Sequence, residues 1–246
     1  MKTILLVGLI TFAVTSQAGL DEGWSAYEKQ DYATAFKEFI TLADQGDATA
    51  QSIVGRMYAD GLGVKRDDAK AVEWRIRAAD LGNVEAQNNL GVMYETGRGV
   101  SQNYAKAVDW YSRAAALGFA VAQHNLGTMY AYGRGVKQNY GKAFMWFSRS
   151  AEQGNAVSQF GLGVMYELGQ SVNQSYAKAA EWYTKASEQG YADAQNNLGF
   201  LYATGRGLDK SSFKAYELWF KAAKAGNTNA ENRLRILCTS EPWVCK

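Results

Sequence analysis

One stretch decides the fold of this chain: ETGRGVSQNYAKA, Glu95–Ala107, which recurs along the sequence. The copies are AYGRGVKQNYGKA at Ala131–Ala143, ADGLGVKRDDAKA ending at Ala71, and ATGRGLDKSSFKA ending at Ala215. Ala71, Ala107 and Ala143 follow one another at intervals of 36 residues, and a fixed period of this length is typical of a repeat array. A phosphate-binding glycine loop needs a strand before it, and none is visible here, so we interpret these segments as turns.

Each repeat predicts two helices joined by a glycine turn. In the unit 83–118, the first half is NVEAQNNLGVMYETG, whose apolar residues recur at helical spacing around Gly91. A glycine inside a helix costs about 1 kcal/mol relative to alanine, so its recurrence predicts close approach of a neighbouring helix. The equivalent glycines are Gly55, Gly127, Gly163 and Gly199.

The second half of the unit, NYAKAVDWYSRAAALG, predicts a helix that is capped at both ends. Asn103 precedes the helix, and Gly118 follows it in the position that often terminates helices. Residues able to accept a hydrogen bond from the first helical turn occupy the position of Asn103 throughout: Asp31, Asp67, Asn139, Ser175 and Ser211. A single helix pair cannot bury both of its apolar faces, so we expect the pairs to stack on one another.

The pattern A-x-x-x-L-G-x-M-Y-x-x-G-x-G-V, followed by Y-A-K-A-x-x-W-Y, resembles the Sel-one-like repeat family, which is related to tetratricopeptide repeats. The resemblance implies an all-α fold: an α/α solenoid in which antiparallel helix pairs form a right-handed superhelix. It covers five units, 47–82, 83–118, 119–154, 155–190 and 191–226. Two departures are the missing second turn glycine at Gly169-Gln170-Ser171, and Leu218 in the tryptophan position with Trp219 one place on.

The segments outside these units predict caps and a signal peptide. Residues 19–46 resemble a tetratricopeptide helix pair, and residues 227–246 repeat the first helix of a unit with a tail. Residues 1–18 have a positive start, an apolar run and a small residue before a cleavage point after Ala18, as secretory signals do. That apolar run is shorter than the roughly 20 residues needed to span a bilayer. We therefore expect a periplasmic or secreted protein of the exported bacterial type.

Composition excludes several partner classes. The chain is 47% apolar with one proline, which is not the composition of a disordered protein. Without residues 1–18 it carries 25 basic and 24 acidic residues, and this balance argues against nucleic acid and acidic membranes as partners. The two cysteines, Cys238 and Cys245, predict a disulfide in an exported protein, whereas a zinc site needs more ligands. No cofactor or metal is expected.

Three features of the sequence are compatible with chemistry. His124 is the one histidine, and no nucleophile or orienting acid stands beside it in sequence, which argues against catalysis. Ser175–Lys178 and Ser211–Lys214 match the S-x-x-K motif of penicillin-binding enzymes, but the companion motifs are absent and the repeat explains both matches. Aromatic residues that could form a sugar-stacking ladder are expected in the core instead. They are Trp74, Trp110, Trp146 and Trp182.

The remaining hypothesis concerns the surface of the first helix of each pair, which usually lines the concave side of such solenoids. Its variable positions, expected to be exposed, carry amides and isolated aromatics. The candidate partner-binding residues are Asn88, Asn89, His124, Asn125, Phe160, Asn196, Asn197 and Phe200. This pattern predicts a non-catalytic scaffold that binds a protein or peptide in its groove. The alternatives are a cell-envelope enzyme and a protein that contacts β-lactams or peptidoglycan.

Overall fold

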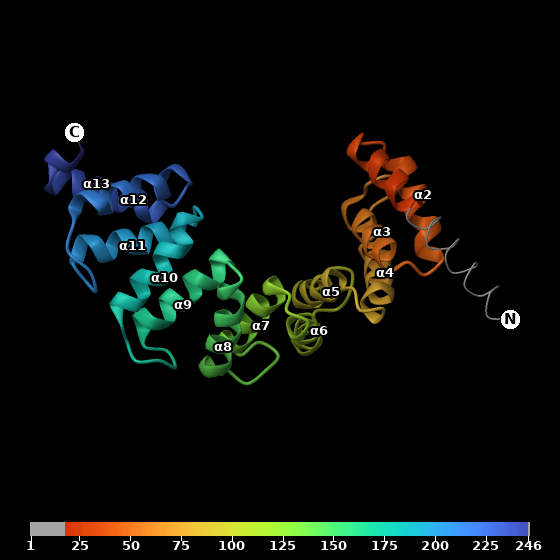
Figure 1. The fold of residues 1–246 in the computed structure, drawn as a ribbon, viewed down its shortest axis with the longest axis horizontal. Helices are drawn as coiled ribbons and strands as arrows, with labels where there is room; N and C mark the ends of the chain where they lie inside the picture. The colour runs from red at the N-terminus through yellow and green to blue at the C-terminus, as the bar shows by residue number, and fades with distance from the viewer. Residues whose placement is uncertain (1–17, 246) are drawn as a thin grey trace. The chain divides into compact units, whose positions relative to one another are not determined.

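The computed structural model describes residues 18–245, within which all regular structure is helical (Figure 1). The first helix, α1, covers residues 18–28. The others are α2 (Tyr32–Asp44), α3 (Ala48–Asp60), α4 (Asp68–Asp80), α5 (Val84–Thr96), α6 (Tyr104–Ala116), α7 (Ala120–Tyr132), α8 (Tyr140–Glu152), α9 (Ala156–Leu168), α10 (Tyr176–Glu188), α11 (Ala192–Thr204), α12 (Ser212–Lys224) and α13 (Thr228–Ser240), followed by the 3-10 helix η1 (Pro242–Cys245). The predicted signal peptide lies, apart from Ala18, outside the described residues.

The helices form two units, Met1–Leu117 and Gly118–Lys246, here called unit 1 and unit 2. Within each unit the helices pack as pairs, and each pair packs against the next. The pairs α3–α4 and α5–α6 belong to unit 1, and α7–α8, α9–α10 and α11–α12 belong to unit 2. The predicted α/α solenoid of helix pairs is therefore confirmed within each unit.

The predicted caps are present at the second helix of each pair. The Asn103 side chain accepts a hydrogen bond from the backbone N–H of Lys106 at 3.0 Å. Its five counterparts accept in the same way at the starts of α2, α4, α8, α10 and α12. These bonds satisfy N–H groups that have no partner inside the helix, and so they fix where each second helix begins.

The glycine inside the first helix makes room for a ring on the second. A Cβ added to Gly91 would lie 2.4 Å from the Tyr111 ring. We call the site of Tyr111 the ring position. It holds Phe147, Tyr183 and Trp219 in the later pairs and Arg75 in α4, and all five side chains are buried. The prediction of close helix approach is confirmed, and a buried side chain on the partner helix is what approaches.

The second turn glycine lies against the preceding helix pair. A Cβ on Gly99 would lie 2.2 Å from the carbonyl oxygen of Asp68, at the start of α4. In the turn between α9 and α10 this glycine is replaced by Ser171, whose φ is 63°. The residue facing Ser171 is Gly141, where α2, α4, α6 and α10 have alanine, and a Cβ there would lie 3.4 Å from Ser171 Oγ. At this contact the glycine is therefore in the helix, at Gly141, and not in the turn, where the other repeats have it.

Candidate functional site

The first-helix positions predicted to be exposed are in fact partly or fully buried. Asn88 and Asn196 are only 7% and 5% exposed, and Phe160 and Phe200 are half-buried. Asn196 shows the reason: Arg233 on α13 donates to its Oδ1 at 3.0 Å, and the Trp219 indole donates to its carbonyl oxygen at 2.9 Å. The ring position and the following helix cover this face, so its amides help to hold repeats together.

His124 belongs to a buried chain of hydroxyl groups in unit 2. Its Nδ1 lies 2.9 Å from Ser158 Oγ, Ser158 donates to Ser150 Oγ at 2.8 Å, and Ser150 donates to the carbonyl oxygen of Ala120 at 2.7 Å. Because the Ser158 proton points to Ser150, the imidazole donates from Nδ1, which therefore carries a proton. Burial lowers the pKa of His124, which agrees with a neutral ring.

Ser158 and Ser150 were not singled out from the sequence. Both replace alanines that recur at the same repeat positions, such as Ala122 and Ala114, and that paired replacement was a readable signal. The arrangement is a serine beside a histidine, but Ser158 is fully buried and already donates its proton elsewhere. A nucleophilic serine must be reachable by substrate and give its proton to the base, so this pair serves packing.

A groove runs along the first-helix side of unit 2 and includes two predicted residues, His124 and Phe160. Its volume is about 430 Å³. Its walls are His124, Thr128, Ala131, Tyr132, Tyr140, Phe147, Val157, Phe160, Gly161, Val164, Met165, Leu168, Gln170 and Tyr191. Tyr132 and Leu168 are 69% and 59% exposed, so large apolar side chains at the groove remain open to solvent. No Asp, Glu, Lys or Arg is among the lining residues.

The Phe160 side chain is fixed by aromatic neighbours. Its ring centroid lies 5.6 Å from that of Tyr183 and 5.3 Å from that of Tyr191, both in tilted geometry. Asn197 donates to the Tyr183 hydroxyl at 3.3 Å, so this predicted residue stabilises the support beneath the groove. A rigid aromatic surface loses little conformational entropy when a ligand covers it.

Phe200 lines a separate hollow of about 270 Å³, next to the C-terminal helix of unit 2. Arg233 stacks over its ring with the guanidinium carbon 4.8 Å from the centroid. Ile236 on α13 is largely exposed at this hollow. Of the other predicted residues, Asn125 in unit 2 and Asn89 in unit 1 are half-buried on their first helices.

The expectation that four tryptophans form the core is confirmed for Trp74 and in part for Trp110 and Trp182, which pack against core clusters without being fully buried. Trp74 is buried, whereas Trp110, Trp146 and Trp182 are half-buried. A cation one helical turn later covers each ring, as Arg113 covers Trp110 at 4.3 Å and Lys185 covers Trp182 at 4.2 Å. The next residue along the helix points into the core instead, which explains why Trp219 in that place is buried. The covered rings have one face occupied by a cation.

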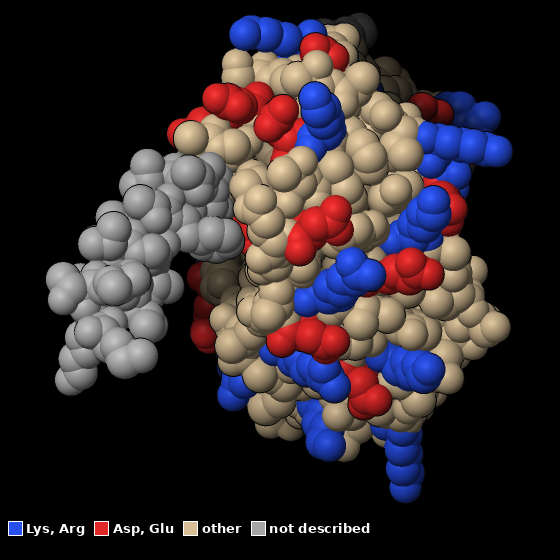
Figure 2. Space-filling model, turned by 90° about the vertical axis from the view of Figure 1, so that its right-hand side faces the viewer, with Lys and Arg blue, Asp and Glu red and all other residues tan. Residues whose placement is uncertain are grey.

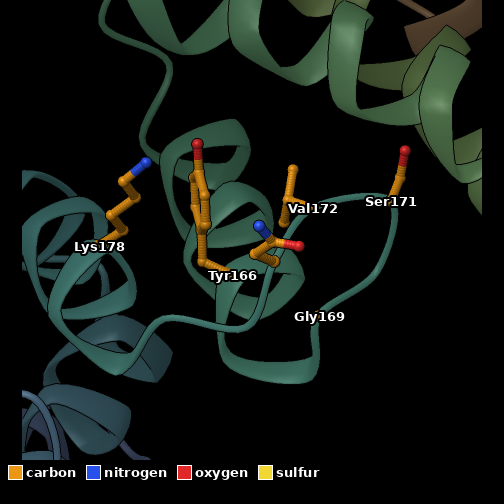
Figure 3. A pocket seen from close by; sticks show the side chains of 6 residues that line it. Tyr166, Gly169, Ser171, Val172 and Lys178 are labelled. Atoms are coloured by element: carbon orange, nitrogen blue, oxygen red, sulfur yellow. The ribbon is translucent and has the colours of Figure 1, made fainter.

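The S-x-x-K matches have ordinary structural roles. Ser175 Oγ accepts a hydrogen bond from the Lys178 backbone N–H at 3.3 Å, and Ser211 does the same for Lys214. Figure 3 shows Lys178 beside Tyr166, and its Nζ lies 5.3 Å from the ring centroid. Lys178 and Tyr166 line a hollow of about 530 Å³ together with Val172 and Asn173. Ser171, in the same loop, projects away from Tyr166 (Figure 3). Each serine therefore caps a helix, and the lysine after it lies on a tyrosine.

The predicted disulfide is present between Cys238 at the end of α13 and Cys245 in η1. Val244 is buried beside it against the α12–α13 core. The bridge thus ties the last turn of the described chain to the helix that closes unit 2. Within residues 18–245, no helix is long and apolar enough to cross a membrane, and no group of three or more His, Cys, Asp or Glu residues could hold a metal ion.

Comparison with known proteins agrees with this geometry. The Sel1 repeat family matches residues 48–83, 84–119, 120–155, 156–191 and 192–227. The chain belongs to the Sel1 repeat family. Sel1 repeats form scaffolds typical of proteins that bind other proteins, and the family is generally non-catalytic. No curated protein matches the chain in sequence.

Among the solved structures that resemble this Sel1 repeat protein are the following three. A protective antigen of uropathogenic Escherichia coli strains with an SLR fold is 38% identical, with a TM-score of 0.84 over 92% of this chain and 50% of that one. The chain therefore spans half of that antigen. A Sel1 repeat protein from Oxalobacter formigenes is 32% identical, with a TM-score of 0.83 over 88% and 86% of the two chains. An immunity protein from Pseudomonas aeruginosa, 21% identical with a TM-score of 0.53 over 88% and 84%, shares the fold.

Proposed function

We propose that this Sel1 repeat protein is a non-catalytic scaffold whose unit 2 groove binds an apolar segment of a partner protein. One observation carries the proposal: a groove of about 430 Å³ whose wall lacks charged residues and whose large apolar side chains face solvent. Exposed apolar clusters framed by polar surface mark interaction sites more often than random surface.

The groove chemistry selects the kind of segment. Covering a side chain such as Leu168 or Tyr132 stabilises a complex by about 1.5–3 kcal/mol each, provided that the partner is itself apolar there. A cationic partner residue would lose water without gaining an ion pair from the groove wall, so the groove disfavours it. His124, Thr128 and Gln170 offer hydrogen bonds that could orient a peptide backbone. The partner is therefore a peptide or helix with consecutive apolar anchors.

The proposed location is the periplasm or the exterior of the cell. The Cys238–Cys245 disulfide indicates an oxidising compartment, since cytosolic thiols are kept reduced. The leader-like residues 1–18 support export and remain a prediction. Mass spectrometry of the protein from a bacterial host would test it, because cleavage after Ala18 leaves an N-terminus at Gly19.

A pull-down with residues 19–246 tests the groove. The bait variant is Tyr132→Ser with Leu168→Ser, two exposed residues whose replacement leaves the core intact. The matched control is Phe213→Ser, because Phe213 is similarly exposed in unit 2 and does not line the groove. Washed sacculi are presented in parallel with envelope extract.

The expected result is a protein retained by wild type and by Phe213→Ser, and lost with the double variant. The retained protein must then bind directly as a purified component. Equal retention by the groove variant would contradict the proposal. Retention on sacculi alone would contradict the proposal and support the alternative, a protein that contacts peptidoglycan.

A further inference from the structure

Arg75 is a buried cation without a carboxylate partner in unit 1. It is 8% exposed, its Nη1 donates to the Met93 thioether at 3.0 Å, and its Nε is buried without a hydrogen bond. Asp60 and Asp68 attract it, but neither lies within ion-pair distance, and Asp68 is already bound by Arg66 and Arg98. A buried charge is normally paired, so an arginine in this state indicates a missing anion.

The equivalent positions of the other repeats show which anion fits. The ring position holds tyrosine in α6 and α10, and there its hydroxyl touches a carboxylate: Tyr111 with Glu95 at 2.7 Å and Tyr183 with Glu167 at 2.5 Å. In the first repeat the place of those glutamates is taken by Ala59. The fold therefore accommodates a carboxylate at the tip of this position, and beside Arg75 the chain does not supply one.

Neighbouring groups favour an external carboxylate. Asn89, 14 residues after Arg75, has the repeat position of Asn197, whose amide donates to the ring-position residue Tyr183. Arg56, one turn from Ala59 on α3, is exposed and stacks on Tyr27 at 5.5 Å, which adds positive charge to the same helix face. On the face shown in Figure 2, basic and acidic side chains lie interspersed, so charged groups on that face have opposite charges nearby.

We propose that Arg75 and Asn89 bind a carboxylate of a partner peptide between α3 and α5 of unit 1. The carboxylate belongs either to an acidic side chain or to a peptide C-terminus, and both present two oxygens to a guanidinium. The inference depends on the proposed scaffold function in one respect: that function is the reason for assigning the carboxylate to a partner peptide. It lies outside the unit 2 groove.

Titration of 15N-labelled residues 19–246 with small carboxylates tests the site, followed through the Arg75 Nε–H and Asn89 side-chain resonances. N-acetylglycine presents a terminal carboxylate, and N-acetylglutamate N-methylamide presents a side-chain carboxylate. N-acetylglutamine N-methylamide is the neutral control, and inorganic phosphate tests for a general anion site. We expect saturable shifts with at least one carboxylate, weaker binding of phosphate and no shifts with the neutral amide.

Two variants separate binding from folding. Arg75→Phe copies Phe147, which stands opposite Ala131, and should fold while weakening carboxylate binding by about tenfold or more. Ala59→Glu supplies the carboxylate internally, as Glu95 does, and should raise the Tm and abolish binding of the probe. Arg113→Phe, a surface arginine of the same unit, should bind like wild type.

Absence of saturable shifts, tighter binding of phosphate, or unchanged binding by Ala59→Glu would overturn the proposal. The titration uses no partner protein, so its failure is distinct from failure of the unit 2 pull-down. The ratio of the two carboxylate affinities decides between a side chain and a C-terminus as the source.

Discussion

The Tyr111 hydroxyl donates a hydrogen bond to Glu95 Oε2 at 2.7 Å, and the two residues change together between repeats. Tyr183 faces Glu167, whereas Phe147 and Trp219, which lack a phenolic hydroxyl, stand opposite Ala131 and Ala203. Burial, and then the Glu95 carboxylate, raise the pKa of Tyr111, so its hydroxyl stays protonated and remains a donor. The pair couples the two helices of one repeat.

Removing one partner of this pair should destabilise the protein more than removing both. Glu95→Ala leaves a buried hydroxyl without its acceptor and should lower the free energy of unfolding by about 1–3 kcal/mol. Adding Tyr111→Phe recreates the Phe147–Ala131 arrangement and should recover part of that loss. Urea unfolding of the two single variants and the double variant measures the coupling energy. Additive effects would show that the hydrogen bond does not contribute.

Two glycines of α9 should respond to alanine in opposite ways. A Cβ at Gly163 would lie 2.4 Å from the Tyr183 ring, so Gly163→Ala should cost about 1–3 kcal/mol through overpacking. At Gly161 the nearest atom would be 3.6 Å away, an ordinary contact, so Gly161→Ala should stabilise by up to about 1 kcal/mol. Thermal unfolding of both variants decides this, and the same sign for both would refute the packing explanation.

Replacing Ser171 by glycine and Gly141 by alanine, the residues found at this contact in other repeats, should stabilise the protein. Ser171 has a left-handed backbone, which costs a residue with a Cβ roughly 1 kcal/mol, so Ser171→Gly should raise stability by about that amount. Gly141→Ala alone places a Cβ 3.4 Å from Ser171 Oγ, whereas the double variant restores the arrangement of the other turns and gains helix propensity. We expect the double variant to have the highest Tm of the four proteins. A lower Tm for Ser171→Gly than for wild type would contradict this account.

His124 should make stability fall as the solution becomes acidic. Its pKa is lowered in the folded state by burial, so the unfolded chain binds the proton more readily. The free energy of unfolding should therefore decrease as the pH falls below about 6.5, by at most about 1.4 kcal/mol per pH unit for one proton. His124→Asn, which copies Asn88 and Asn196, should remove this part of the dependence. Parallel urea titrations at neutral and acidic pH would show it, and identical pH profiles for both proteins would exclude His124 as the cause.

The disulfide should stabilise the C-terminal closure of unit 2. In the loop-entropy model, closing a loop this short contributes about 2–3 kcal/mol. Cys238→Ala with Cys245→Ala should lower the Tm and speed amide exchange in α13, with a smaller effect on unit 1. Hydrogen-exchange mass spectrometry localises the change. Unaltered exchange in α13 would show that the packing of Val244 suffices.

The repeat made the secondary structure predictable. Each N-cap, such as Asn103, acts within four residues of its own position, and each turn glycine responds to local backbone geometry. Interactions over so few residues can be predicted from the sequence, and six copies of the N-cap position make each assignment less ambiguous. The cysteine pair was predictable for the same reason, because seven residues separate its members.

Exposure on the first-helix face was not predictable in the same way. Variety at the position of Asn88, His124 and Phe160 suggested a solvent-exposed surface, but Asn88 is buried, and His124 and Phe160 contact Ser158 and Tyr191 of the next repeats. The partial exposure of the tryptophans has the same origin: Trp110 and Tyr111 are adjacent on one helix, and only the rotation of that helix against its partner buries the second fully. Helical periodicity defines a stripe about 100° wide, which cannot separate two neighbouring residues at its edge.

The sequence by itself determined the helix pairs, their caps and turns, the 36-residue period and the cysteine pairing, because each depends on residues close together in the chain. Only the tertiary structure decided which side chains are buried, that Ser158 meets His124, that Arg75 lacks a carboxylate, and where the groove opens. Those features join residues from successive helices, and their distances depend on how the helices are rotated and spaced. Packing sets that geometry, and the order of residues along one helix does not specify it.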